Sequence, residues 1–281
     1  MLFLIRIAVF ALIVSCAPAV ADDIWPPAAA PTDALPGHPG KTFLDLIALV
    51  IPDIEEKDGT FQGTNIIPMR HIDGHPAEAP GVMNLDTLSV LNVNSDGKPH
   101  VALFFTLGET PGAVESFSLL ALFDVAGEPR LLDAVAVGYD RFTSLYGQHK
   151  MPVSAGSDVI LTMSSHSNSN QAYLTTLMIL VRGDRFDLID SIFTLDERAC
   201  TYERVQVPRY EARPGAARFA DIRVSITDSI TLTGFDCGDD EKPEPMSRTI
   251  TTIYRWHIDE KKYVPDDDAL EQLQDENKER L

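Results

Sequence analysis

The sequence is short of positive charge, of cysteine and of long apolar runs. Its 281 residues include 23 Lys and Arg against 42 Asp and Glu, which gives a net charge of -19. This charge repels nucleic-acid backbones and anionic lipid headgroups, so we expect no nucleic-acid partner. Three cysteines are too few for a cysteine-based zinc or iron–sulfur site, and we expect neither a cofactor nor a metal. No apolar run reaches the roughly 20 residues of a membrane-spanning helix.

Residues 1–21 have the pattern of a secretory signal peptide. Arg6 precedes an apolar run over residues 7–14, and small residues at 19–21 provide a cleavage site. The full sequence is 44% hydrophobic and 23% charged, which is typical of a folded globular protein. We therefore expect a periplasmic or secreted protein.

A second interpretation of the N-terminus stays open. The sequence Ile-Val-Ser-Cys at 13–16 resembles the lipobox of bacterial lipoproteins. In that case the signal is 1–15, and Cys16 is lipidated and becomes the new N-terminus. The chain would then be a membrane-anchored lipoprotein, and in both cases it lies outside the cytoplasm.

The remaining segments differ in composition along the chain. Residues 22–41 hold five prolines among alanines and predict a tether. Helical spacing of apolar residues predicts a short N-terminal helix over 42–51, which begins a single β-rich domain over 42–265. A polar C-terminal tail over 266–281 has a short helical pattern.

Export also determines how the cysteines are interpreted. Cys16 leaves with the signal or carries lipid, so Cys200 and Cys237 remain as a pair in a compartment where disulfides persist. We predict a disulfide between them, which would restrain the unfolded chain by roughly 3–4 kcal/mol. Cys237 belongs to an insertion over 234–247, and the bridge would clamp this insertion to the neighbouring unit.

From Leu88 onward the pattern changes to short segments rich in Val, Ile, Phe and Thr, separated by glycine-containing turns. Residues 122–135 and 179–192 match in pattern at an offset of 57. We therefore expect two repeated hairpin or meander units and a third from Phe219 onward. The predicted fold is mainly β and antiparallel, either propeller-like or sandwich-like, with short N-terminal and C-terminal helices.

The best candidates for ligand contact lie in a turn and on a late strand. The run at 164–170 is rich in hydroxyl and amide groups and lies at the tip between two predicted strands. We predict that His166, Asn168 and Asn170 contact a ligand there. Trp256 is the fourth candidate, because it could form an aromatic platform with neighbouring tyrosines, although a core position is the alternative.

Metal sites have weaker support. His71 and His75 have helical zinc-ligand spacing, but glycine and proline interrupt the segment, so a zinc site would need Asp73 and a remote ligand. The acidic runs 239–241 and 266–268 lack the alternating spacing of a calcium loop. Solvated surface charge is the simpler interpretation of both runs.

No Gly-x-Ser-x-Gly elbow and no intact phosphate-binding loop occurs in the sequence, so we expect no catalytic residue. The leading hypothesis is a non-catalytic binding or assembly module of the bacterial cell envelope. Its partner would be an envelope protein, a peptide or a glycan. The alternative is an envelope hydrolase that uses carboxylates or a loop histidine, which a pocket joining His149 or His166 to a carboxylate would favour.

Overall fold

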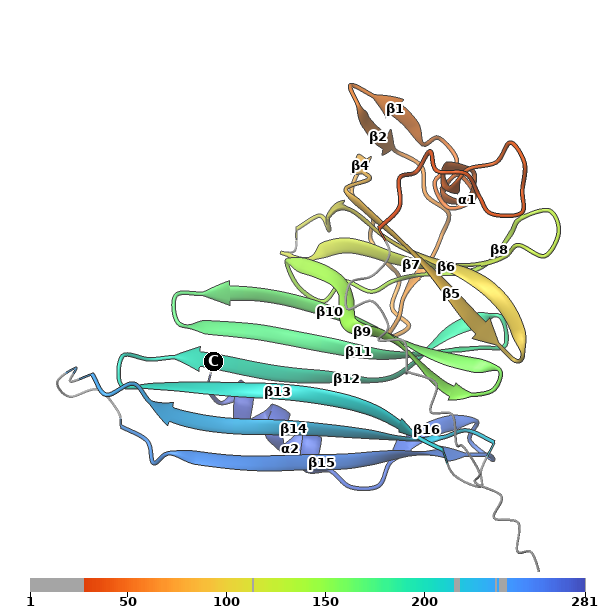
Figure 1. Ribbon diagram of the computed structural model, residues 1–281. Coiled ribbons are helices and arrows are strands. Elements are labelled where there is room, and N and C mark those ends of the chain that lie inside the picture. Colours follow the sequence, from red (N-terminus) through yellow and green to blue (C-terminus); the bar gives the residue numbers. More distant parts are fainter. Residues whose placement is uncertain (1–27, 113, 215–217, 236, 238–241, 281) are drawn as a thin grey trace, which may run out of the picture.

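The computed structural model describes residues 28–112, 114–214, 218–235, 237 and 242–280. Its strands stack in layers that follow the order of the chain (Figure 1). A small three-stranded sheet comes first, then a sheet of five strands, then one of eight strands. Consecutive strands are antiparallel neighbours within the two large sheets, so the predicted mainly β, antiparallel meander architecture is confirmed.

The N-terminal layer contains one helix and three short strands. Helix α1 (Phe43–Ile47) begins where the Thr42 backbone N–H donates to Asp45 Oδ2 at 2.7 Å. This bond lowers the pKa of Asp45 and satisfies a donor that the helix leaves free. The predicted helix over 42–51 is therefore present but ends earlier. The three short strands are β1 (Glu55–Lys57), β2 (Thr60–Gly63) and β4 (Met83–Asn84).

Three units of four antiparallel strands form the body. The first consists of β5 (Thr87–Ser95), β6 (Lys98–Glu109), β7 (Ser116–Asp124) and β8 (Arg130–Ala136), with β3 (Arg70–His71) added at its edge. The second consists of β9 (Phe142–Ser154), β10 (Ser157–Asn168), β11 (Gln171–Arg182) and β12 (Arg185–Arg198). The third consists of β13 (Tyr202–Arg213), β14 (Asp221–Leu232), β15 (Met246–His257) and β16 (Lys262–Pro265). The second and third units share the eight-stranded sheet.

The two matching hairpins of the sequence are β7–β8 and β11–β12. Each carries one β-bulge on its return strand, where two residues face one on the partner. The extra residue is Leu132 in the first hairpin and Ile189 in the second. These two positions are 57 residues apart, so the repeat extends to an irregularity of the backbone.

The central strands are apolar on both faces because they lie between two layers. On β6, Phe105 packs toward α1, whereas its neighbour Phe104 packs toward the second unit. On β10, Ile160 faces the first unit and Leu161 faces the third. All four side chains are buried. Each contributes roughly 1.5–3 kcal/mol by leaving water, and together they join the units into one stack.

The eight-stranded sheet folds over between its two units. Strands β12 and β13 pair through only two residue pairs and then diverge. Helix α2 (Ala269–Lys278) lies at this opening and buries Leu270 and Leu273 between the units. Leu195 N donates to Gln206 Oε1 at 2.9 Å, and the amide of Gln206 forms a reciprocal pair with Asn277. A side chain thus accepts the backbone hydrogen bond of Leu195 at the point where β12 has no strand partner.

The predicted disulfide is present between Cys200 and Cys237, with their Cα atoms 6.2 Å apart. Cys200 lies in the turn between β12 and β13, and Cys237 follows β14. The bridge therefore joins the insertion to the end of the second unit, as the sequence predicts.

The described part of the predicted tether, 28–41, packs on the body. Ala29 N donates to Leu88 O at 3.1 Å, and the Leu35 side chain is buried against the first sheet. An apolar side chain in this proline-rich segment explains the packing, because its burial offsets the entropy lost by ordering the chain.

The predicted signal peptide 1–21, the alternative signal 1–15 and Cys16 lie outside the described residues. Among the helices that the structure does describe, none has the length and apolar character needed to span a membrane.

Candidate functional site

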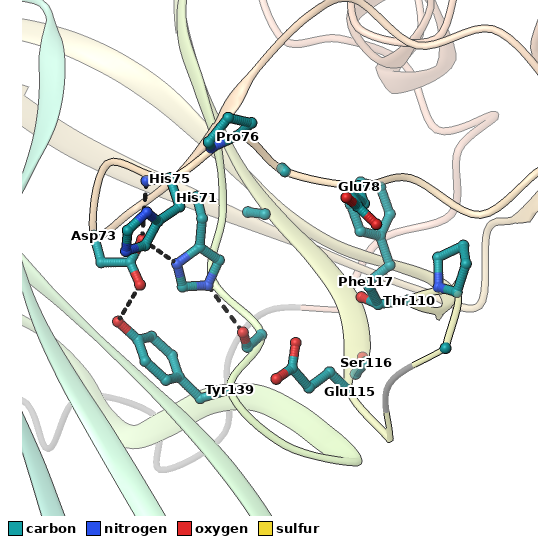
Figure 2. Close-up of a pocket in the computed structure, with 15 residues that line it drawn as sticks. His71, Asp73, His75, Pro76, Glu78, Thr110, Glu115, Ser116, Phe117 and Tyr139 are labelled. Atoms are coloured by element: carbon teal, nitrogen blue, oxygen red, sulfur yellow. Dashed lines mark hydrogen bonds and ion pairs between the residues drawn. The ribbon is translucent and has the colours of Figure 1, made fainter.

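A cavity that we call the His71 pocket lies beside the first unit. It has a volume of about 330 Å³. The loop that follows β3, the β6–β7 connection and the end of β8 line it (Figure 2). Residues far apart in the sequence therefore form one polar surface, which includes His71, Asp73, Glu78, Glu115 and Tyr139.

One wall of the pocket is a hydrogen-bonded cluster around His71. Its Nδ1 lies 2.9 Å from Asp73 Oδ1, and its Nε2 lies 2.9 Å from the Gly138 carbonyl oxygen. The Tyr139 hydroxyl donates to Asp73 Oδ2 at 3.3 Å, and the His75 backbone N–H donates to Asp73 Oδ1 at 3.2 Å. Figure 2 shows these contacts as a continuous chain along one side of the cavity.

The electrostatics of this wall follow from burial and hydrogen bonding. Burial raises the pKa of the Asp73 carboxyl, but the hydrogen bonds from His71 and the His75 backbone outweigh it, so the net shift is downward. Burial, and then the negative charge of Asp73, raise the pKa of Tyr139. At neutral pH the Asp73 side chain is therefore an ionised carboxylate, and it accepts a hydrogen bond from the protonated Tyr139 hydroxyl.

Local backbone geometry explains why the wall forms. Gly74 has φ +101°, a conformation that L side chains rarely adopt, and it lets the chain turn between His71 and His75. At Gly138 an added Cβ would lie 1.9 Å from the Ser116 carbonyl oxygen. Glycine therefore allows two backbone segments to approach closely at the point where Gly138 O accepts from His71.

Two further carboxylates line the pocket. Figure 2 shows Glu78 across the cavity from the His71–Asp73 wall and Glu115 at its lower edge, near Tyr139. Among the residues placed by the structure, no Lys, Arg or His forms an ion pair with either glutamate. The pocket therefore has negative charge that the chain itself does not neutralise.

The zinc alternative has no support in this geometry. Both ring nitrogens of His71 face protein oxygen atoms, so neither is available to a metal. Within the described ranges, no group of three or more His, Cys, Asp or Glu side chains is arranged to hold a metal ion.

His166, a predicted ligand residue, forms a pair with a carboxylate. Its Nδ1 lies 2.5 Å from Asp140 Oδ2, and its ring contacts Tyr173 with centroids 4.6 Å apart. Asn168 Nδ2 donates to the Tyr173 hydroxyl at 2.8 Å. The main-chain carbonyl oxygen of Asn170 accepts a hydrogen bond from the backbone N–H of Arg198. These residues lie together at the β10–β11 tip, and their contacts order the turn.

Trp256 lies far from these three residues. The strand registers place the β10–β11 tip at one end of the eight-stranded sheet and Trp256 at the other. Its ring packs on Phe219 at 4.3 Å between centroids, and the Arg182 guanidinium carbon lies 5.1 Å from its centre. The four predicted ligand residues therefore do not form one site, and Trp256 packs at the edge of the core.

The acidic run 266–268 is bound into the local structure. Asp266 accepts from Ile253 N, Asp267 accepts from the Thr252 hydroxyl, and Asp268 accepts from the Gln272 amide. These contacts hold the entry to α2. The run 239–241 lies outside the described residues.

Four residues of these sites are not predicted from the sequence: Glu78, Glu115, Tyr139 and Asp140. Tyr139 and Asp140 follow Gly138 in the short connection between the first two units, and this Gly-Tyr-Asp string was the available signal. The two glutamates gave no signal, because 42 acidic residues supply too many candidates.

Comparisons with protein-family models, with curated proteins and with solved structures find no match to this chain.

Proposed function

We propose that this chain is a non-catalytic binding module of the bacterial cell envelope. Its His71 pocket receives a positively charged group, such as a lysine or arginine side chain, from a partner protein or peptide. The observation that carries the proposal is the pair of glutamates, Glu78 and Glu115, that face the cavity without a cationic partner among the described residues. A cavity of about 330 Å³ is within the size range of ligand sites.

The charge of the whole chain supports a cationic partner. A net charge of -19 attracts a basic protein over distances of about a Debye length, roughly 8–10 Å at physiological salt. The glutamates are partly hydrated, so each contact with a cation contributes only about 1 kcal/mol or less. Tight binding would thus need a wider interface around the pocket.

The envelope location is part of the proposal. The Cys200–Cys237 disulfide supports an oxidising compartment, as does the apolar N-terminal segment with its cleavage pattern. Intact mass of the protein isolated from its host separates the two forms of the N-terminus. A chain beginning at Asp22 indicates a periplasmic or secreted protein, and a lipidated Cys16 indicates a membrane-anchored lipoprotein. A chain that retains residues 1–21 would contradict export.

The binding proposal is tested by calorimetric titration of the purified protein with a lysine-rich octapeptide. We expect the double variant Glu78→Gln, Glu115→Gln to bind about tenfold more weakly, which corresponds to about 1.4 kcal/mol. The control is Glu56→Gln with Glu203→Gln, which removes the same charge from exposed positions elsewhere. Equal weakening in both double variants would mean that only the overall charge attracts the peptide, and the pocket would have no role.

Hydrolysis is the second candidate function, because His166 and Asp140 form a histidine–carboxylate pair at 2.5 Å. Such a pair orients an imidazole for general-base catalysis. However, no serine, threonine or cysteine side chain in the described part of the chain hydrogen-bonds to the His166 ring. Turnover of ester or glycoside substrates that disappears in His166→Ala would favour the hydrolase over the binding module.

A further inference from the structure

A second cavity, of about 350 Å³, is lined by strands of the second unit and by Gln206 of the third. We call it the Ser165 groove. Side chains that are directly paired on neighbouring strands share one face of a sheet. One such row crosses four strands and consists of Phe142, Ser165, Leu174 and Thr194. A second row consists of Ser167, Ala172 and Asp196.

The alternation of side chains places His166 on the other face. His166 is paired with Tyr173, and both lie between the two rows of the groove. Their rings contact each other and lie on the face that carries Asp140. The groove face is instead that of Leu161, which is buried against the third unit. His166 and Tyr173 nevertheless border the cavity, so the histidine–carboxylate pair lies at the margin of the groove.

The groove surface is polar; the Tyr173 hydroxyl bonds Asn168 and Gln171, but three other hydroxyls are not used by the described fold. Within the residues that the structure describes, no hydrogen bond engages the hydroxyls of Ser165, Ser167 or Thr194. Asp196 accepts from Gln206 N through Oδ1 at 2.8 Å, and its second carboxylate oxygen has no hydrogen bond from the described chain. The rim residue Phe142 is 65% exposed. The groove thus combines free hydroxyl and carboxylate oxygens with an exposed aromatic ring.

Two classes of ligand fit this surface poorly. No lysine or arginine lines the groove, and the chain has a net charge of -19, so an anionic ligand would be repelled. An extended peptide adds to a sheet through free backbone groups. Strands β10 and β11 already pair with neighbours on both sides, and where β12 lacks a strand partner the side chains of Gln206, Gln274 and Asn277 bond the backbone of Phe193 and Leu195. Recognition in the groove must use side chains.

From this combination we propose that the Ser165 groove binds a short, uncharged oligosaccharide. Ring hydroxyls of the sugar exchange hydrogen bonds with the three free hydroxyls and with the free oxygen of Asp196. The C–H face of a sugar ring packs on Phe142 and on the neighbouring Leu174, which line the same row. This ligand is different from the cationic group assigned to the His71 pocket, so the two proposals stand or fall independently.

The test is calorimetric titration of the full exported protein with two probes, the trisaccharide of N-acetylglucosamine and maltotriose. We expect at least one probe to bind, and we expect Phe142→Ala and Asp196→Asn each to weaken that binding about tenfold. Both positions tolerate the change, because Phe142 is exposed and an asparagine oxygen can still accept from Gln206 N. The matched control is Phe235→Ala, which removes another exposed phenylalanine, 70% exposed, outside the groove.

Several outcomes would overturn the proposal. The first is that neither trisaccharide binds at millimolar concentration. The second is that Phe142→Ala and Phe235→Ala weaken sugar binding equally. Binding of an uncharged peptide that depends on Phe142 and Asp196, without sugar binding, would assign the groove to peptides. The lysine-rich peptide and the Glu78, Glu115 variant report on the His71 pocket, so failure of one proposal is distinguishable from failure of the other.

Discussion

Replacing Asp228 by asparagine should remove a large part of the stability of this protein. Asp228 lies on β14 with no exposed surface. Its carboxylate accepts from Arg204 Nε at 2.8 Å, from Arg204 Nη2 at 2.7 Å and from Arg248 Nε at 3.0 Å. The Arg248 guanidinium also forms an ion pair with Glu276 on α2. One buried carboxylate therefore joins β13, β14, β15 and, through Arg248, the C-terminal helix.

The magnitude follows from what remains after the substitution. Arg248 is 41% exposed and can turn to water, but Arg204 is 7% exposed and keeps its charge without a counterion. Removing one partner of a buried ion pair costs about 3–5 kcal/mol. Total stability of a domain is about 5–15 kcal/mol, so the loss would lower the melting temperature by about 10 °C or more.

Chemical denaturation measures this free energy, and Asp275→Asn is the matched control. Asp275 pairs with Lys278 on the surface, with both side chains 63% exposed, so its loss should cost about 0.5 kcal/mol or less. A third variant, Arg204→Met with Asp228→Leu, removes both charges and should be more stable than Asp228→Asn alone. If Asp228→Asn were no less stable than the surface control, the buried ion pair would not hold the third unit together.

The same carboxylate predicts how stability depends on pH. Burial raises the pKa of Asp228, but its hydrogen bonds to Arg204 and Arg248 outweigh this, so the folded pKa lies below the ordinary value of 3.8. A group with a lowered folded pKa stabilises the fold fully above its unfolded pKa, about 3.9, and loses that contribution as pH falls through the folded value. Wild type should therefore lose stability below about pH 4 more steeply than Asp228→Asn.

Three further substitutions have defined expectations. Cys200→Ser with Cys237→Ser should lower the free energy of unfolding by about 4 kcal/mol, because the bridge closes 37 residues; an unchanged denaturation midpoint would contradict this. Gly156→Ala should lower the free energy of unfolding by about 1–3 kcal/mol, because the new Cβ would lie 2.5 Å from Gly97 N where two hairpin tips meet. Thermal melting measures this loss, and an unchanged melting temperature would show that the tips can separate. Tyr254→Phe should cost about 1–3 kcal/mol by removing a buried 2.5 Å hydrogen bond to a carboxylate, as urea denaturation would measure, and full stability would refute that role.

The repeated hairpins could be predicted because their contacts are local. Residues 122–135 and 179–192 each contain two apolar segments around a short turn, and such segments pair with each other before any distant strand is involved. The same reasoning predicts the third unit, whereas the Cys200–Cys237 bridge was predicted from the expected export of the chain and the loss of Cys16 to the signal or to lipid.

The first strand of each unit was harder to predict. Strand β9 alternates between buried and exposed residues, and β13 carries charged residues and a proline among its apolar ones. Both lie at a fold or an edge of the sheet, so one face meets water and the sequence pattern is weaker. The central strands β6 and β10 gave the stronger signal because both of their faces are buried.

The candidate sites illustrate where sequence reasoning stops. His166 was a ligand candidate by residue type and borders the Ser165 groove, but its pairing with Asp140, 26 positions away, comes only from the tertiary structure. Glu78 and Glu115 had no distinguishing pattern, and only the packing of three separate segments brings them to one cavity.

By itself the sequence determined that the chain forms antiparallel meanders, that two distant cysteines pair and that positive charge is scarce. Hydrophobic alternation and turn residues are local patterns of a few residues, and net charge is a sum over the whole chain. Both can be obtained directly from the sequence. The tertiary structure alone decided which faces of the units meet, that β12 and β13 diverge around α2, and which polar groups remain free. Those outcomes depend on contacts such as that between His71 and Gly138, 67 positions apart, whose register is set by the packing of whole layers.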